Sequence, residues 1–344
     1  MGSLAEVGSE EASRKSSLGS ETMKLRVFAF ASAMIAGLTF GLPSNAQSYP
    51  TKPVKIIVPY QAGQGTDVGA RLFAEQLTKA LGQQVYVDNK PGAGGNIGTA
   101  DAARSPNDGY TLLMGTVATQ TMNEFLYPSL GYDSQKDFEP IALVGMLPMV
   151  ISANPSFAAN SVAELIAAAK ARPDKIDIGL PSTTARLVFE LLKERSGAPL
   201  FGVPYKGSAT AMQEVTGGQL PVIVDTATAT RGQVAGGKLK PLGITTLKSS
   251  ELMPGVKSVA EQGFPGFEVT AWNALYAPKG TPRTVVDRIN AEVAKILAQP
   301  ETRQRLLQIG FEPAGGTPGE LAAFEKRERE KWGPLIKAAG LKAD

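Results

Sequence analysis

The spacing of hydrophobic positions changes repeatedly along the chain, from short β-branched runs to stretches with helical periodicity. The run VKIIVPY at residues 54–60 predicts a buried strand, and the apolar stripe of residues 66–82 predicts a helix that ends at Gly82. The same alternation continues through residues 83–89, 96–105 and 110–116. Strands that alternate with helices are typical of parallel strands joined by helical crossovers, so the pattern predicts an α/β fold.

A second alternating series follows the first. Its expected strands and helices are residues 148–154, 161–173, 175–180, 184–197, 201–205, 208–218, 220–225 and 240–246. Ser161 and Ser208 are predicted helix N-caps, and Gly197 and Gly217 are predicted helix ends. The chain therefore contains two α/β units.

The C-terminal part is strongly helical. An apolar stripe follows Pro282, and the capping box formed by Thr317 and Glu320 predicts a further helix through Trp332. The apolar stretches at residues 141–155 and 267–278 are candidates for segments that pass between two lobes. Two crossings would make the first lobe discontinuous, with lobe 1 at residues 48–146 plus 269–344 and lobe 2 at residues 147–268.

Composition removes several kinds of chemistry. The 344 residues are 43% hydrophobic, which is enough for a substantial core, but they include neither Cys nor His. Thiolate nucleophiles, imidazole bases, imidazole metal ligands and disulfides are thereby excluded. The net charge is only +3 and the basic residues are dispersed, so no nucleic-acid partner is expected.

The N-terminal region predicts secretion. Lys24 and Arg26 precede an apolar run at residues 27–42, and the small residues Ser44 and Ala46 follow at cleavage-site spacing. Residues 23–46 are therefore expected to be a signal peptide, with the mature protein starting at Gln47. A membrane anchor is the alternative, because the run approaches the length of a span. Residues 1–22 are interpreted as an extension or a mis-called start.

The glycine-rich segment PGAGGNIG at residues 91–98 resembles a dinucleotide fingerprint only superficially. Ile97 stands where the third glycine is required, and the next strand ends without the acid that would hold a ribose. A glycine-rich turn is the favoured interpretation, and no phosphate-binding GxxxxGK[ST] loop is present. A Ser208–Lys206 catalytic pair is disfavoured because residues two apart across a turn do not reliably face each other.

The loop at residues 59–72 is the strongest candidate site. Unsatisfied N–H groups and the positive dipole end meet at a helix N-terminus, which suits an anion without any arginine. Thr66 and Asp67 can equally act as caps, and Asp67 can instead accept a donor group of the ligand. Polar strand-to-helix junctions of the same kind occur at residues 115–121, 179–186 and 204–209. Ligands of open α/β sheets bind beyond the carboxyl ends of the strands, so these loops can converge on one cleft.

Several long motifs in a fixed order resemble one family. They are residues 55–72, 89–103, 108–113, 203–219, 237–246 and 277–292. The chain resembles the tripartite tricarboxylate transporter (TTT) substrate-binding proteins, the Bug family of periplasmic solute receptors. The resemblance implies a periplasmic binding protein fold of type II, a Venus flytrap with two α/β lobes joined by two crossing strands. It also implies carboxylate binding by loop backbone groups, hydroxyls and ordered waters, without metal, cofactor or catalysis.

The resemblance further implies a set of ligand-binding residues from both lobes. They are Tyr60, Ala62, Gly63, Thr66, Asp67, Thr116, Ala118, Thr119, Ser182, Thr183, Thr184, Arg186, Lys206, Gly207, Ser208, Ala209 and Asp225. Many relatives carry a longer loop that ends in His where this chain has LPSTTAR at residues 180–186. Arg186 can meet a second carboxylate bidentately, which suggests an aromatic dicarboxylate such as terephthalate, or it can point to solvent.

The expected function is delivery of a small organic carboxylate to a membrane permease that has large and small subunits. We expect a monomer in the periplasm that is not an enzyme. The alternatives are a secreted hydrolase or isomerase, for which no nucleophile–base pair is evident, and a ligand receptor for a sensor kinase.

Overall fold

The structure is a computed structural model that describes residues 49–172, 176–338 and 340–343. The expected extension, the signal peptide and the mature start at Gln47 lie outside these described residues. Among the helices that the structure describes, none is both long and apolar enough for a membrane span.

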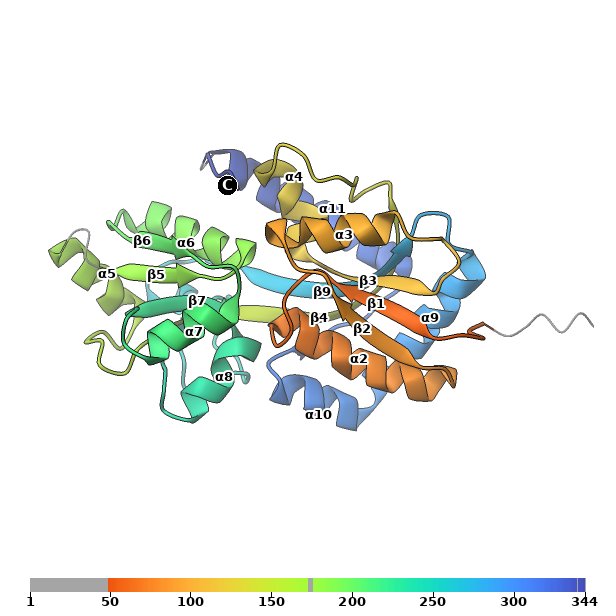
Figure 1. Ribbon diagram of the computed structural model, residues 1–344. Helices are drawn as coiled ribbons and strands as arrows, with labels where there is room; N and C mark the ends of the chain where they lie inside the picture. The colour runs from red at the N-terminus through yellow and green to blue at the C-terminus, as the bar shows by residue number, and fades with distance from the viewer. Residues whose placement is uncertain (1–48, 173–175, 339, 344) are drawn as a thin grey trace, which may run out of the picture. The chain divides into compact units, whose positions relative to one another are not determined.

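The first lobe contains the N-terminal and C-terminal elements of the described chain (Figure 1). Its strands are β1 (Val54–Val58), β2 (Val85–Asn89), β3 (Thr111–Thr116), β9 (Thr270–Pro278) and β10 (Glu312–Pro313). Its helices are α2 (Gly65–Leu81), α3 (Asn96–Ala103), α4 (Asn123–Leu126), α9 (Arg283–Ala298), α10 (Pro300–Gln308) and α11 (Pro318–Ala338). Two short helical turns, η1 (Ala93–Gly95) and η2 (Ala118–Met122), follow β2 and β3.

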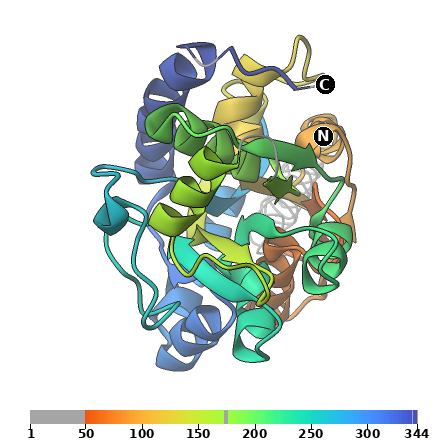
Figure 2. The same cartoon turned by 90° about the vertical axis from the view of Figure 1, so that its left-hand side faces the viewer.

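The second lobe is built from the middle of the chain. Its strands are β5 (Asp177–Leu180), β6 (Phe201–Pro204), β7 (Val222–Thr226) and β8 (Lys240–Ile244). Its helices are α5 (Val162–Ala171), α6 (Thr183–Ser196), α7 (Ser208–Thr216), α8 (Ala227–Ala235) and the turn η3 (Ala260–Gln262). Figure 2, viewed from the second-lobe side, shows helices on both faces of these strands.

One long strand, β4 (Phe138–Ala153), connects the two lobes. Up to Pro148 it pairs with β9 of the first lobe, and from Met149 it pairs with β7 and β8 of the second. The chain returns at Val269, whose N–H donates to the carbonyl of Thr245 (3.1 Å) immediately before β9. The sheet order is β2-β1-β3-β9-β4-β7-β5-β6. The lobe boundaries expected from the sequence stay a prediction.

Parallel pairing places the carboxyl ends of neighbouring strands at the same edge of each lobe's sheet. β1 pairs in parallel with β2 and β3, and β5 pairs in parallel with β6 and β7. In β1, Ile56 faces the core that contains Phe73 of α2, while Ile57 faces the core that contains Trp332 of α11. Burial on both faces explains why the strand is a continuous apolar run.

The helix boundaries confirm most of the predicted caps. The Ser161 hydroxyl accepts the N–H of Glu164 (3.1 Å), and Gly197 ends α6 in a left-handed conformation. Thr317 and Glu320 form the capping box, although the helix continues beyond Trp332 to Ala338.

The prediction of Ser208 as an N-cap is wrong. Gly207 is the N-cap of α7, and Ser208 is the first helical residue. Glycine is an accepted N-cap, so the helix needs no hydroxyl there. The Ser208 hydroxyl instead accepts a hydrogen bond from Gln64 Nε2 of the first lobe (3.5 Å).

Candidate functional site

The predicted loops meet at a cavity between the two lobes. Its volume is about 50 Å³, and a water needs roughly 10–15 Å³ of such space, so the cavity suits a small ligand. The residues that line it are Tyr60, Gln64, Gly65, Thr66, Thr116, Val117, Leu147, Met149, Ser182, Thr184, Ser208, Asp225, Thr226, Ala271, Trp272 and Asn273.

Four helices begin at this cavity. Gln64, the N-cap of α2, lines it from the first lobe. Ser182, Ser208 and Thr226 line it at the starts of α6, α7 and α8 of the second lobe. The first N–H groups of a helix lack intrahelical partners and carry the positive end of the helix dipole. The cavity therefore has the electrostatics of an anion site.

Hydroxyl groups shape the first-lobe wall. The Tyr60 hydroxyl lies 3.0 Å from Thr116 Oγ1, and the Thr116 N–H donates to Thr119 Oγ1 (3.1 Å). Burial raises the pKa of Tyr60 to about 12, partly offset by the Thr116 hydroxyl, so the phenol stays neutral and able to donate. Thr119 is buried behind Thr116 and holds it in place from outside the cavity lining.

Asp225 is the acidic side chain of the cavity. It is the penultimate residue of β7, directly before Thr226, whose N–H donates to Asp225 Oδ1 (2.8 Å), and it is only 3% exposed. Burial raises the pKa of Asp225 to about 6, against the lowering influence of the Ser208 hydroxyl and the Thr226 N–H. At neutral pH the carboxyl is therefore mainly ionised and acts as an acceptor.

The structure brings only part of the predicted set to the cavity wall. The predicted residues that line it are Tyr60, Thr66, Thr116, Ser182, Thr184, Ser208 and Asp225. The predicted residues outside its lining are Ala62, Gly63, Asp67, Ala118, Thr119, Thr183, Arg186, Lys206, Gly207 and Ala209. Of these, Lys206 and Ala209 are exposed and Arg186 is half-buried.

Asp67 supports the first loop instead of lining the cavity. Its Oδ2 accepts the N–H of Gly63 (2.8 Å) and Arg71 Nε (2.9 Å), and its Oδ1 accepts Asn89 Nδ2 (2.9 Å). These bonds hold the pKa of Asp67 below its usual value although burial opposes them. The prediction that Thr66 or Asp67 caps this helix is wrong, because Gln64 is the N-cap of α2 and no side chain caps it. Asp67 instead ties Gly63 of the loop to the first turn of the helix.

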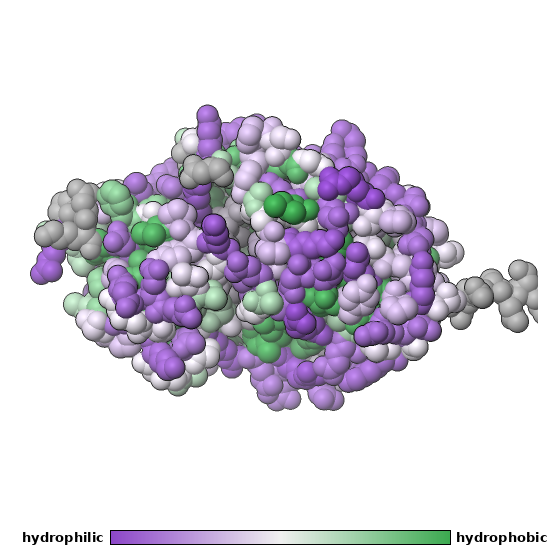
Figure 3. Space-filling view, in the orientation of Figure 1, coloured by the Kyte–Doolittle hydropathy of each residue, from purple (hydrophilic) through white to green (hydrophobic). Residues whose placement is uncertain are grey.

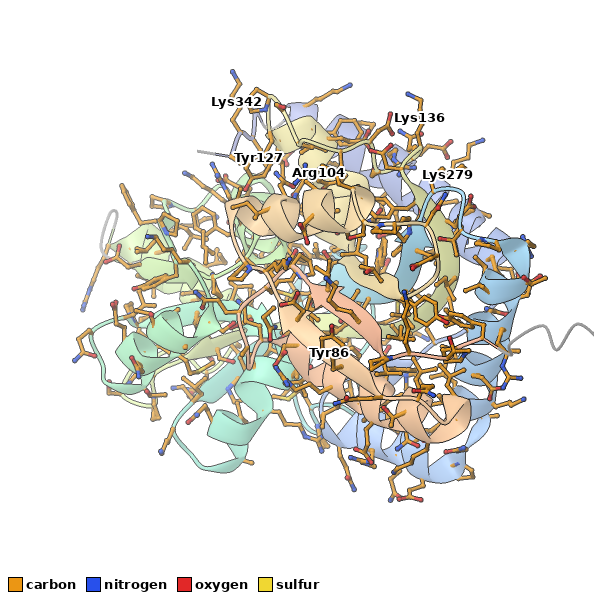
Figure 4. The ribbon with its side chains drawn as sticks, turned by 45° about the vertical axis from the view of Figure 1, so that its right-hand side comes forward. Tyr86, Arg104, Tyr127, Lys136, Lys279 and Lys342 are labelled. Carbon is orange, nitrogen blue, oxygen red and sulfur yellow. The ribbon has the colours of Figure 1, made fainter. Side chains whose placement is uncertain are left out.

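Thr183 and Gly207 of the second lobe lie outside the cavity lining but face the first lobe. A Cβ at Gly94 of the η1 turn would lie 3.2 Å from Thr183 Oγ1 and 2.4 Å from the hydroxyl of Tyr127, which Figure 4 labels. A Cβ at Gly207 would lie 2.3 Å from Gln61 Oε1. The glycine-rich turn and the α7 N-cap are therefore places where the lobes approach each other closely.

Sequence reasoning missed the floor of the cavity. Leu147, Met149, Ala271, Trp272 and Asn273 come from the two segments that connect the lobes, β4 and β9. Only their position in candidate crossing segments could have indicated them. Asn273 Nδ2 donates to Thr66 Oγ1 and to the carbonyl of Trp272 (both 3.2 Å).

The cavity depends on no cationic side chain. Among the described lining residues there is neither Lys nor Arg. In Figure 4, Lys136 and Lys279 project from the outer surface, where they pair with Asp133 (2.7 Å) and Glu139 (3.0 Å). Nor does the described part of the chain hold a group of three or more acidic residues able to bind a metal ion.

Comparison with known proteins identifies the family. Residues 69–341 match the family described as "Tripartite tricarboxylate transporter family receptor". The structure of R. palustris Rpa4515 with adipate is 34% identical, with a TM-score of 0.83, over 86% of this chain and 99% of that one. The periplasmic binding protein BugD is 38% identical with a TM-score of 0.81, over 86% and 100% of the two chains. MatC from Rhodopseudomonas palustris with bound malate is 30% identical with a TM-score of 0.77, over 84% and 100%.

These matches confirm the predicted two-lobed α/β fold of periplasmic binding proteins and its non-enzymatic character, because the matched structures are solute-binding proteins. With more than three-quarters of its length matched, the chain belongs to the tripartite tricarboxylate transporter receptor family and is a Bug-type solute-binding protein.

Proposed function

We propose that the protein closes on a small organic dicarboxylate in the periplasm and delivers it to a membrane permease with large and small subunits. The observation that carries this proposal is the convergence of the α2, α6, α7 and α8 N-termini on one cavity without Lys or Arg. Each helix N-terminus stabilises a nearby anion, by up to about 2 kcal/mol where the geometry is partly buried. Bound adipate in Rpa4515 and bound malate in MatC support the same ligand class.

The lining residues are the proposed ligand contacts. Tyr60, Thr66 and Thr116 offer hydroxyls from the first lobe, and Ser182 and Ser208 offer them from the second. Because Arg186 lies outside the lining, no guanidinium there can meet a second carboxylate bidentately, so the proposed ligand is an aliphatic dicarboxylate and not terephthalate.

Because ligand contacts come from both lobes, binding favours the closed arrangement by its differential affinity for that state. A permease can then distinguish loaded from empty receptors by their closure.

A monomer is sufficient for this role. On the face seen in Figure 3 hydrophobic surface is scattered among polar residues, and the exposed large hydrophobics Tyr86, Ile97, Phe201, Leu247 and Leu307 come from different elements.

A thermal-shift screen of aliphatic dicarboxylates on the mature protein tests the proposal. A ligand present at 100 times its Kd stabilises the native state by about 2.7 kcal/mol and raises Tm. In Thr183→Phe the aromatic ring fills the space between α6 and the η1 turn, so the Kd of the best ligand should rise at least tenfold. Titration calorimetry measures that change.

Thr183→Ser is the matched control, since it keeps a small hydroxyl at the same position and should bind like wild type. Thr183 is preferred to Ser182 because the Ser182 hydroxyl also caps α6 through the N–H of Ala185 (3.1 Å). If no dicarboxylate shifts Tm, or if Thr183→Phe binds as tightly as wild type, the two-lobe clamp is wrong.

A further inference from the structure

Two buried acceptor oxygens lack a hydrogen-bond partner at the cavity. Among the described residues, Asp225 Oδ2 and Asn273 Oδ1 have no donor, and their side chains are 3% and 2% exposed. Ser208 lies beside Asp225 and lowers its pKa, but it does not complete a hydrogen bond to Oδ2. A buried acceptor without a donor is costly, so each oxygen calls for a donor from the molecule that fills the cavity.

The other atoms of the two side chains fix which atom faces the ligand. Asp225 Oδ1 is engaged by the Thr226 N–H (2.8 Å), so Oδ2 is the free acceptor. Asn273 Nδ2 donates to Thr66 Oγ1 and the Trp272 carbonyl, which assigns the amide orientation and leaves Oδ1 as the free acceptor.

The two acceptors belong to different lobes. Asp225 lies near the end of β7 in the second lobe, whereas Asn273 lies in β9 opposite Thr116 of the first. A ligand that carried only carboxylates would bring further negative charge to Asp225 with no donor for either oxygen. A hydroxyl or ammonium group of the ligand can donate to one of these acceptors. Donation to the Asp225 carboxylate forms a charge-assisted hydrogen bond.

We propose that the natural ligand is a carboxylate that also carries a hydroxyl or amino donor, and that Asp225 is the residue that selects this donor. This inference rests on the proposed function and specifies its substrate class. The carboxylates of the ligand meet the helix N-termini, and the donor group meets Asp225 Oδ2, with Asn273 Oδ1 as a second acceptor from the other lobe.

The test is calorimetric titration with matched acids of four, five and six carbons. Each set contains the unsubstituted dicarboxylate, its 2-hydroxy analogue and its 2-amino analogue, for example succinate, malate and aspartate. For the best-binding length, we expect the hydroxy or amino analogue to bind at least tenfold more tightly than the unsubstituted acid. Comparing the hydroxy analogue with the amino analogue shows which of the two donor groups the protein prefers.

Asp225→Asn is the decisive variant. The amide oxygen of the new Asn can still accept the Thr226 N–H, but the negative charge is removed. The preference of at least tenfold for the hydroxy or amino acid, expected for wild type, should therefore be lost. Binding of the unsubstituted acid should be retained or improved, which also shows that the variant folds. Glu292→Gln is the matched control, because it neutralises a buried carboxyl of α9 outside the cavity and should leave the preference unchanged.

The possible results separate the two proposals. If unsubstituted acids bind wild type as tightly as their analogues, or if Asp225→Asn keeps the preference, the selection by Asp225 is wrong while carboxylate binding stands. If none of the acids binds wild type, both proposals fail.

Discussion

At the scale of single residues, Glu325 is a buried carboxyl that supports the cavity from behind. It accepts the hydroxyl of Tyr276 (2.6 Å), and Tyr276 packs against Gly115, the residue before Thr116. On the same helix, Arg329 Nη2 donates to the carbonyl of Gln120 (2.7 Å) in η2. Helix α11 thus holds the β3–η2 junction that presents Thr116 to the cavity.

The ionisation of Glu325 should make stability depend on pH. Burial raises its pKa from 4.5 to about 7, against the lowering influence of Tyr276 and Arg329. The native state therefore binds this proton more tightly, so the stability contribution is complete below pH 4.5 and is lost as pH rises through 7. Glu325→Gln removes the titration, so its free energy of unfolding should exceed that of wild type at pH 8, by on the order of 3 kcal/mol at most.

Urea denaturation at pH 4, 6 and 8 measures this difference, which should shrink toward zero at pH 4. Glu330→Gln is the control, because Glu330 lies on the same helix with its side chain 65% exposed. A difference that stays constant between pH 4 and 8 would contradict the assignment to Glu325.

The sequence predicted many of the cavity residues that follow strand ends, although not Gln64, Gly65, Val117 or Thr226. It also missed those whose role depends on packing. Ser182 and Asp225 stand at strand-to-helix junctions, and the topology of parallel strands is enough to bring such junctions together. Trp272 and Asn273 lie inside a strand with no local polar signal, so only the pairing of β9 between β3 and β4 places them at the floor. Arg186 shows a further limit: the suitability of an arginine for carboxylates does not indicate where its side chain points, and this one lies outside the cavity lining.

At the scale of elements, α2 is the first-lobe helix whose N-terminus lies at the cavity. It must pack closely against the elements around it. Gly69 is where it approaches most closely: a Cβ there would lie 2.4 Å from Cζ of Phe311, which is fully buried. The absence of a side chain at Gly69 therefore sets the depth of the helix, and with it the position of Gln64 and Thr66 in the cavity.

Gly69→Ala should consequently destabilise the protein. Alanine is the better helix former, but overpacking against Phe311 costs about 1–3 kcal/mol and should dominate. Gly232→Ala is the matched control: Gly232 lies inside α8 with no atom within 4 Å of a new Cβ, so it should be stabilising by up to about 1 kcal/mol. Urea denaturation followed by circular dichroism compares them, and equal effects would show that the contact with Phe311 is not restrictive.

Element identities were predictable because both periodicities were clear, whereas two irregular elements were not. The η2 turn, a π-helical turn directly after β3, has no sequence signature, since its shape follows from Thr116, Thr119 and the carbonyl contact of Arg329. The crossing at residues 141–155 was predicted, but the earlier start of β4 at Phe138 was not. Pro140 and Pro148 interrupt its apolar run, yet the strand continues from one lobe into the other with register shifts at Pro140 and Leu143.

At the scale of the whole receptor, the proposed closure involves hydrogen bonds between the two lobes. Gln64 donates to Ser208 (3.5 Å), Ser250 donates to Glu312 (3.0 Å), and Arg231 donates to the carbonyl of Leu307. A hydrogen bond contributes only about 0.5–1.5 kcal/mol net, so a ligand that contacts both lobes adds substantially to the free energy that favours closure. Under the proposed function, such a balance would let an empty receptor reopen after delivery.

Gly207 provides a direct test of closure. Its backbone is extended (φ 173°), a conformation open to any residue, so a side chain there leaves the second lobe unstrained. Gly207→Ala should bind normally, because the nearest atom, Oε1 of Gln61, is the end of an exposed flexible side chain. Gly207→Phe places a ring between α7 and the first-lobe loop, so the Kd of the best dicarboxylate should rise at least tenfold while ligand-free stability in urea changes little. Small-angle scattering should then show ligand-induced compaction in wild type and Gly207→Ala but not in Gly207→Phe; compaction and tight binding in all three would mean that the lobes do not close at Gly207.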